Sequence, residues 1–180
     1  MKKSILFLSF IAITAGAMAQ KLTTTSAVVT FDATTPKDAL PKAENKAVIA
    51  SLDKTTGAVA FEAAVNNFSF TNAMIQDHFN GEKWMNSASF PKFTFVGKID
   101  KLSKIKFDKD GTYDVEVSGN ITVKGISQPI NAPAKVTVKG GAVSATSTFG
   151  IKLKDFGITG QAIDAGKVAE KPTVAVAVQF

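Results

Sequence analysis

Most of the chain after residue 20 alternates apolar and polar positions with a period of two, the pattern of a β-strand with one buried face. The pattern predicts eight strands, over residues 27–31, 47–52, 59–65, 90–99, 113–123, 134–138, 143–149 and 174–180. Several of the stretches between them are short and rich in Asp, Lys and Gly, the composition of hairpin turns. The sequence therefore predicts an all-β domain built of antiparallel strands.

One segment departs from this period. Asn72 suits a helix N-cap, and the helix that follows it carries Met74, Ile75, His78 and Phe79 on one face. We therefore expect one or two short helices inserted near residues 72–86. A short helix between strands can bury its apolar stripe only against the end of the strand structure. The sequence thus predicts a lid, with Met74 and Phe79 facing inward.

Eight antiparallel strands in one domain can close into a barrel or stack as a sandwich, and closure removes the exposed sheet edges. An eight-stranded barrel is just wide enough to fill with side chains or to hold one small ligand. The chain has 14 phenylalanines against one tyrosine and one tryptophan. Aromatic rings without a polar group belong in a dry environment. Any one of these rings can simply fill the core, but their gathering between residues 61 and 95, around the helix, leads us to propose a lined cavity.

Strand parity predicts which side chains line that cavity. Phe61 and Val65 share one face of their strand, and Phe93 and Phe95 share one face of theirs. The complete predicted lining consists of Phe61, Val65, Phe68, Phe70, Met74, Phe79, Trp84, Phe93, Phe95, Val115, Val117, Phe149 and Phe156. His78 and Lys154 are the candidate polar groups at the rim of the cavity.

Composition excludes most catalytic machinery. The chain has no cysteine and a single histidine, which excludes disulfides, thiol nucleophiles, iron–sulfur sites and any site that needs two imidazoles. His78 with Glu82 four residues later offers two metal ligands at most, and no pattern points to a third. We therefore predict no catalytic residue, no metal site and no cofactor, so the protein is not expected to be an enzyme.

The charge of the chain does not favour nucleic-acid binding. The formal net charge is +6, but all the basic residues are lysines, and they are scattered among 15 acidic residues. Arginine, the side chain best suited to bidentate contacts with phosphate or guanine, is absent. The lysines are therefore interpreted as a solvated strand face.

The first 19 residues have the three parts of a secretory signal peptide. Lys2 and Lys3 precede a short apolar run at residues 5–13, and Ala17-Met18-Ala19 forms a cleavage site. The apolar run is shorter than the roughly 20 residues that span a bilayer. We therefore expect a signal peptide over 1–19 and an exported domain over 20–180, located in the periplasm or secreted, without a membrane span.

Three segments carry a resemblance to a known family. They are AMIQDHFN with WMNSASFPKFTFVG (73–80 and 84–97), GNITVKGI (119–126) and FGIKLKDFGI (149–158). Together they resemble the YceI-like family, in the same order along the chain. Lys154 stands where arginine is common in that family, and residues 21–32 lack the histidine that many members carry.

The resemblance implies a lipocalin-like antiparallel barrel whose apolar pocket, in characterised members, holds a long isoprenoid or a similar amphiphile. We therefore expect an exported binding protein for an isoprenoid, quinone-like or other amphiphilic lipid, serving storage, transport or stress protection. Its only expected partner is that ligand, and it is expected to be a monomer or a homodimer. Two alternatives stay open: a filled structural or interaction barrel without a ligand, and a metal-assisted enzyme centred on His78.

Overall fold

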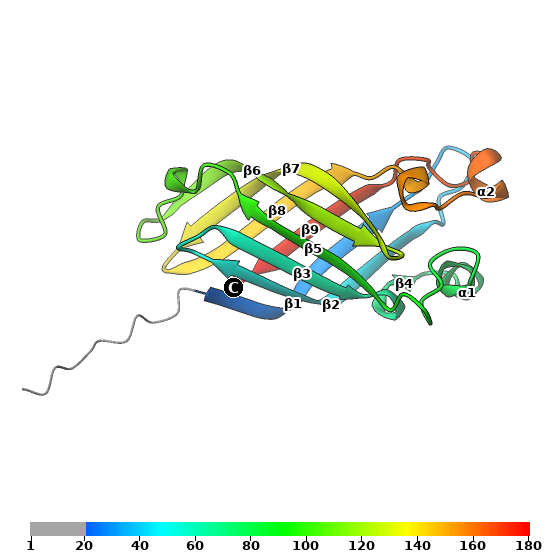
Figure 1. Ribbon diagram of the computed structural model, residues 1–180, viewed down its shortest axis with the longest axis horizontal. Coiled ribbons are helices and arrows are strands. Elements are labelled where there is room, and N and C mark those ends of the chain that lie inside the picture. Colours follow the sequence, from blue (N-terminus) through cyan, green and yellow to red (C-terminus); the bar gives the residue numbers. More distant parts are fainter. Residues whose placement is uncertain (1–20) are drawn as a thin grey trace, which may run out of the picture.

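The computed structural model describes residues 21–180, which form one antiparallel sheet that curls into a barrel (Figure 1). The predicted signal peptide over 1–19 lies outside the described residues. The strands are β1 (Lys21–Asp32), β2 (Lys42–Asp53), β3 (Ala58–Ala64), β4 (Ser69–Phe70), β5 (Lys92–Ile99), β6 (Gly111–Val123), β7 (Ile126–Lys139), β8 (Ala142–Gly150) and β9 (Thr173–Gln179). The helices are α1 (Ala73–Asn80) and α2 (Gln161–Asp164), with short 3₁₀ helices η1 (Val65–Asn67), η2 (Leu102–Lys104) and η3 (Leu153–Phe156).

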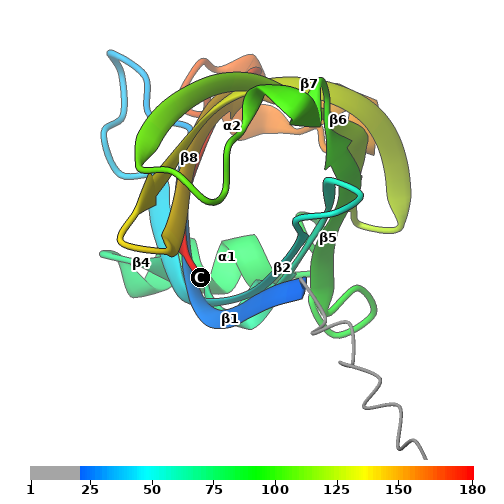
Figure 2. The ribbon, with the colours of Figure 1, turned by 90° about the vertical axis from the view of Figure 1, so that its left-hand side faces the viewer.

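The sheet closes because β1 has two neighbours. The strand order is β1-β9-β8-β7-β6-β5-β3-β2, and β1 also pairs with β2, so that the eight long strands form a ring (Figure 2). The two-residue strand β4 extends the sheet beside the first residues of β2. The predicted eight-stranded antiparallel barrel is therefore confirmed, and a sandwich is excluded. One helix lies in the predicted interval 72–86, and the second, α2, lies outside it.

Apolar side chains close the barrel at both ends. The helices α1 and α2 lie at the same end (Figure 1), where Phe79, Leu153 and Phe156 belong to one cluster of buried residues. At the opposite end, a second buried cluster contains Ile105 and Val138, beside the β5–β6 connection and the β7–β8 turn. The space between the two clusters is the barrel interior.

Two bulges interrupt the strand period where β1 meets β2. The register shifts between Thr24 and Ala27 and again between Ala27 and Val29. A bulge inserts one extra residue and restores the inward direction of the side chains that follow it. Both strands therefore continue beyond the stretches of regular alternation, and each is 12 residues long.

Asn45 holds one of these bulges from inside the barrel wall. Its side chain is fully buried (0% exposed), its Nδ2 donates to the Ala64 carbonyl at 3.0 Å, and its Oδ1 accepts from the Ala47 amide at 2.9 Å. A buried amide of this kind is tolerated because its donor and its acceptor are both satisfied.

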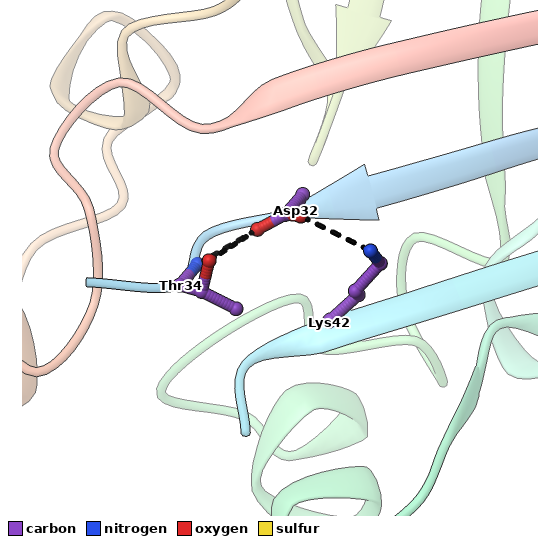
Figure 3. Close-up of polar contacts among 3 residues, drawn as sticks. All are labelled: Asp32, Thr34 and Lys42. Atoms are coloured by element: carbon purple, nitrogen blue, oxygen red, sulfur yellow. Dashed lines mark hydrogen bonds and ion pairs between the residues drawn. The ribbon is translucent and has the colours of Figure 1, made fainter. Parts of the chain in front are cut away.

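A polar contact joins the last residue of β1 to the first residue of β2 (Figure 3). The Asp32 carboxylate accepts from the Thr34 hydroxyl at 2.7 Å and from the Thr34 amide at 3.1 Å, and lies 3.3 Å from the Lys42 ammonium. The Thr34 hydroxyl first, and then the Thr34 amide and Lys42, hold the pKa of Asp32 below its ordinary value. The contact holds the two strands together where the chain leaves the barrel for the loop over 33–41.

We predict that Asn45→Ala lowers the free energy of unfolding by about 2–3 kcal/mol, because it removes the two hydrogen bonds that a fully buried side chain makes with the Ala64 carbonyl and the Ala47 amide. Urea denaturation measures the change. Asn131→Ala is the matched control, since Asn131 is exposed on β7 and is expected to change stability by less than about 0.5 kcal/mol. Equal losses in the two variants would contradict the role assigned to Asn45.

Candidate functional site

The barrel encloses a cavity of about 180 Å³. All eight long strands contribute to its wall, and α1 contributes Phe79 at one end. The lining is apolar except for Thr94, Thr146 and Ser147. The hydroxyl of Ser147 donates to the Pro133 carbonyl at 2.7 Å, so that this polar group already has a protein partner. The cavity is therefore a dry space that offers a ligand few hydrogen bonds.

Side-chain size explains why the interior is not full. Large rings at Phe61 and Phe95 project from β3 and β5, whereas β7 and β8 present Ala132, Ala134 and Ala145, and β8 lies opposite β3 in the ring of strands. Alanine methyl groups do not reach across an eight-stranded barrel, whose interior holds either side chains or a small ligand. The cavity is the volume that these alanines leave unfilled.

A pair of glycines lets the Phe95 ring lie against the wall. Gly97 and Gly119 are direct partners on β5 and β6. A Cβ added to Gly119 would lie 2.5 Å from the Val96 carbonyl oxygen and 2.6 Å from Cζ of Phe95. The tip of the ring thus occupies the place that two side chains would otherwise take. This packing keeps the ring close to the strands and leaves the centre of the barrel open.

Phe79 closes the α1 end of the cavity. Its ring is 6% exposed, and its centroid lies 6.2, 6.0, 4.9 and 6.5 Å from those of Phe31, Phe68, Phe70 and Phe93. These distances are typical of aromatic pairs that attract one another. The helix therefore carries one large apolar plug into the barrel end, which confirms the predicted inward direction of Phe79.

Two polar side chains hold α1 in place. Asn72 caps the helix as predicted, since its side chain accepts from the Ile75 amide at 3.2 Å. Gln76 attaches the helix to the chain beside it: its Nε2 donates to the Phe68 carbonyl at 2.8 Å, and its Oε1 accepts from the Phe70 amide at 3.0 Å. The amide of Gln76 thus pairs with the β4 segment as a neighbouring strand would.

The structure brings about half of the predicted lining residues to the cavity. Those that line it are Phe61, Phe68, Phe79, Phe93, Phe95, Val117 and Phe149. Val65, Val115 and Phe156 are buried in the apolar clusters around it, and Phe70 and Trp84 are partly buried against the cluster at the α1 end. The sequence did not identify Val29 and Phe31 of β1 or the alanines of β7, because no local pattern reveals which strands lie opposite one another.

Met74 does not face the interior, contrary to prediction. Its side chain is 67% exposed. The buried side of α1 passes through Ile75 and Phe79, four residues apart, and the exposed side passes through Met74 and His78. Of the four residues predicted on one face, Ile75 and Phe79 therefore form the buried side, and the face was predicted one residue too wide.

The predicted polar rim is not part of the cavity wall. His78 and Lys154 are exposed, on α1 and η3, and neither lines the cavity. Within residues 21–180, no three His, Asp or Glu side chains come together as metal ligands. In the same residues, no helix combines the length and the apolar character needed to cross a membrane.

Comparison with known proteins places this barrel in a family. The YceI-like domain matches residues 9–180. The chain belongs to the YceI-like family. A UPF0312 protein of Yersinia pestis is 30% identical over 135 residues, which are 71% of this chain and 65% of that protein. A UPF0312 protein of an Enterobacter species is 28% identical over 120 residues, 63% of this chain and 57% of that protein.

Two solved structures share the YceI-like fold with this chain. BcnA of Burkholderia cenocepacia superposes with a TM-score of 0.71 and 20% identity, over 86% of this chain and 96% of BcnA. A polyisoprenoid binding domain from Saccharophagus degradans superposes with a TM-score of 0.74 and 11% identity, over 89% of this chain and 97% of that domain. At these identities the likeness establishes the barrel and not its ligand.

We predict that Phe79→Ala lowers the free energy of unfolding by about 3 kcal/mol, near the lower end for a buried Phe because one side of its ring borders the cavity. Thermal or urea denaturation measures the loss. Met74→Ala, five residues earlier on the same helix, is the control and is expected to change stability by less than about 0.5 kcal/mol. A Phe79→Ala protein with an unchanged free energy of unfolding would contradict the role of Phe79 in closing the α1 end.

Proposed function

We propose that this YceI-like protein binds an apolar or amphiphilic small molecule, such as an isoprenoid, a quinone-like molecule or another lipid, inside its barrel, for storage, transport or stress protection. The observation that carries the proposal is the apolar cavity enclosed by all eight strands. A lipid tail placed there gains about 25 cal/mol for each Å² of apolar surface removed from water. The polyisoprenoid binding domain of Saccharophagus degradans has the same fold, which supports this class of ligand.

The cavity supports a binding role over a filled structural barrel. Close-packed protein interiors contain few voids larger than one water molecule. A volume of 180 Å³ corresponds to the liquid volume of about six waters. A barrel selected only for stability has no need of alanines at positions 132, 134 and 145 of the cavity wall, because larger side chains there would fill the space.

A binding role also fits the chemistry of the wall better than a catalytic one. The three hydroxyl side chains of the lining are Thr94, Thr146 and Ser147, and they have no acid or base beside them in the cavity. His78, the centre of the enzyme alternative, is exposed outside it. A wall of this composition selects a ligand by the length and shape of its apolar part, and leaves the head group to interactions outside the cavity.

We propose as well that the domain is exported after removal of residues 1–19. The charged start, the apolar run and the Ala17-Met18-Ala19 site support this proposal. N-terminal sequencing of the exported protein is expected to begin at Gln20. A mature protein that begins at Met1, or inside β1, would contradict it.

We predict that Phe95→Asp abolishes lipid retention, as does Phe93→Asp, because each places an unpaired charge in an apolar space. Native mass spectrometry after gentle extraction, together with titration of a fluorescent fatty acid, measures retention and affinity. Val96→Asp is the matched control, since the adjacent Val96 is 64% exposed on the outer face of β5 and is expected to leave retention unchanged.

Because the Asp variants can fail to fold, a further variant that keeps the cavity wall apolar tests the same site. Ala134→Leu fills part of the cavity from the opposite wall and is expected to weaken retention at least tenfold while the protein stays folded. Retention of the same lipid by folded Phe93→Asp and Phe95→Asp variants would place the binding site elsewhere. A wild-type protein that is always empty, with no affinity for isoprenoids or fatty acids, would overturn the proposed function.

A further inference from the structure

The strand pairing of the barrel is incomplete along one boundary. β7 pairs with β6 from Ile126 to Val138, but with β8 only from Ala134 to Lys139. β8 nevertheless continues to Gly150, paired with β9 on its other side. Residues 126–133 of β7 therefore have no ladder on the β8 side. We name this boundary, between residues 128–133 of β7 and 148–150 of β8, the β7–β8 seam.

The turn between the two strands fixes which backbone groups of β7 face β8. A two-residue turn, Gly140 and Gly141, joins them, so that Lys139 and Ala142 form the closing pair. In a two-residue hairpin the closing residues exchange backbone hydrogen bonds, and along the strand every second residue presents its N–H and C=O to the same neighbour. The odd-numbered residues of β7 therefore face β8.

Proline occupies two of these odd positions in the unpaired half. Proline has no N–H to donate, and Pro133 stands where the ladder ends. The Thr148 carbonyl opposite it has no N–H of β7 to accept from, and the Pro133 carbonyl accepts from the Ser147 hydroxyl at 2.7 Å. Pro129 removes a second donor four residues earlier. The seam is therefore encoded in the sequence, because these prolines prevent the two strands from pairing there.

The cavity and an outer groove lie on the two sides of the barrel wall at this boundary. Ile130, Ala132 and Phe149 line the cavity along the inner side of the seam. On the outer side, a groove of about 630 Å³ lies over β6, β7 and β8, with Pro133 and Thr148 in its wall. Ala134, Thr146 and Ser147 belong to the walls of both the cavity and the groove. A single layer of small side chains thus separates the two spaces.

The two spaces differ in the part of an amphiphile that each suits. The cavity is apolar and, at 180 Å³, smaller than the roughly 300–1,000 Å³ of most small-molecule sites, so that it encloses only part of a ligand of ordinary size. The groove is charged, with Asp100, Lys101, Lys104, Asp114, Glu116 and Lys135 in its wall. An apolar tail fits the first space and a polar end fits the second.

We propose that the β7–β8 seam is a lateral portal through which the apolar part of an amphiphilic ligand enters and leaves the barrel, while its polar end stays in the outer groove. The proposal rests on the proposed binding function. The competing route is the α1 end, where Phe79 packs among four rings and Gln76 holds the helix. At the seam no backbone ladder has to break, and two side-chain hydrogen bonds hold the boundary: the Ser147 hydroxyl donates to the Pro133 carbonyl at 2.7 Å, and Nε2 of Gln128 donates to the Asp155 carbonyl of the adjoining η3 at 2.8 Å.

Two glutamines give a matched test of the two routes. Gln128 closes the seam and Gln76 closes the α1 end, each by an amide that donates to a backbone carbonyl at 2.8 Å, and neither residue lines the cavity. Stopped-flow fluorescence with cis-parinaric acid, a fluorescent polyene fatty acid, measures its association and release rates for the wild-type protein, Gln128→Ala and Gln76→Ala. We expect Gln128→Ala to raise both rates at least threefold, with Kd within twofold, and Gln76→Ala to leave both rates unchanged.

A second variant tests the seam from the opposite direction. Pro133→Val restores the missing N–H, and it is expected to slow both rates at least threefold, because the ladder between β7 and β8 extends. Faster exchange in Gln76→Ala but not in Gln128→Ala would overturn the portal in favour of the α1 end, and unchanged rates in all three variants would overturn it as well. A wild-type protein that binds no cis-parinaric acid or isoprenoid would overturn the proposed function itself, before any rate is compared.

Discussion

The width of a closed eight-stranded barrel is the constraint on which the rest of the structure depends. That width is fixed by the strand number, so that the sizes of the inward-facing side chains alone decide whether the interior is solid or hollow. Here the inward positions carry phenylalanines on β3 and β5 but alanines on β7 and β8, and the Gly97–Gly119 pair lets the Phe95 ring lie close to the wall. The cavity, and any ligand that it holds, follow from these few choices of residue size.

The sequence predicts the strands wherever their alternation is regular and loses them where it breaks. The extension of β1 back to Lys21 and of β2 back to Lys42 was not predicted, because bulges shift the parity partway along each strand. The prediction for β7 covered only residues 134–138, and the missing half contains Pro129 and Pro133. That half is also the part of β7 without a partner on β8, so the same prolines explain both the missed prediction and the open ladder.

The candidate site was predictable on the aromatic wall and not on the wall opposite. Parity within one strand identified Phe61, Phe93 and Phe95, since their alternation is visible in the sequence. The small residues that leave the space empty carry no local signal, because their role depends on which strand faces them across the barrel. The choice between Met74 and Ile75 on α1 depends on a rotation of one residue, which an eight-residue helix with apolar side chains at both positions does not fix.

The family, the cavity and the interrupted ladder are the observations behind the proposal that the barrel holds the apolar part of a molecule and exchanges it through its side. The most direct test of the central claim, that the interior is a binding site, is native mass spectrometry of the wild-type protein purified from the cells that make it. The account predicts a stoichiometric adduct, of one lipid per chain, that is lost on extraction with organic solvent. A bare protein mass that stays unchanged after incubation with isoprenoids and fatty acids would contradict it.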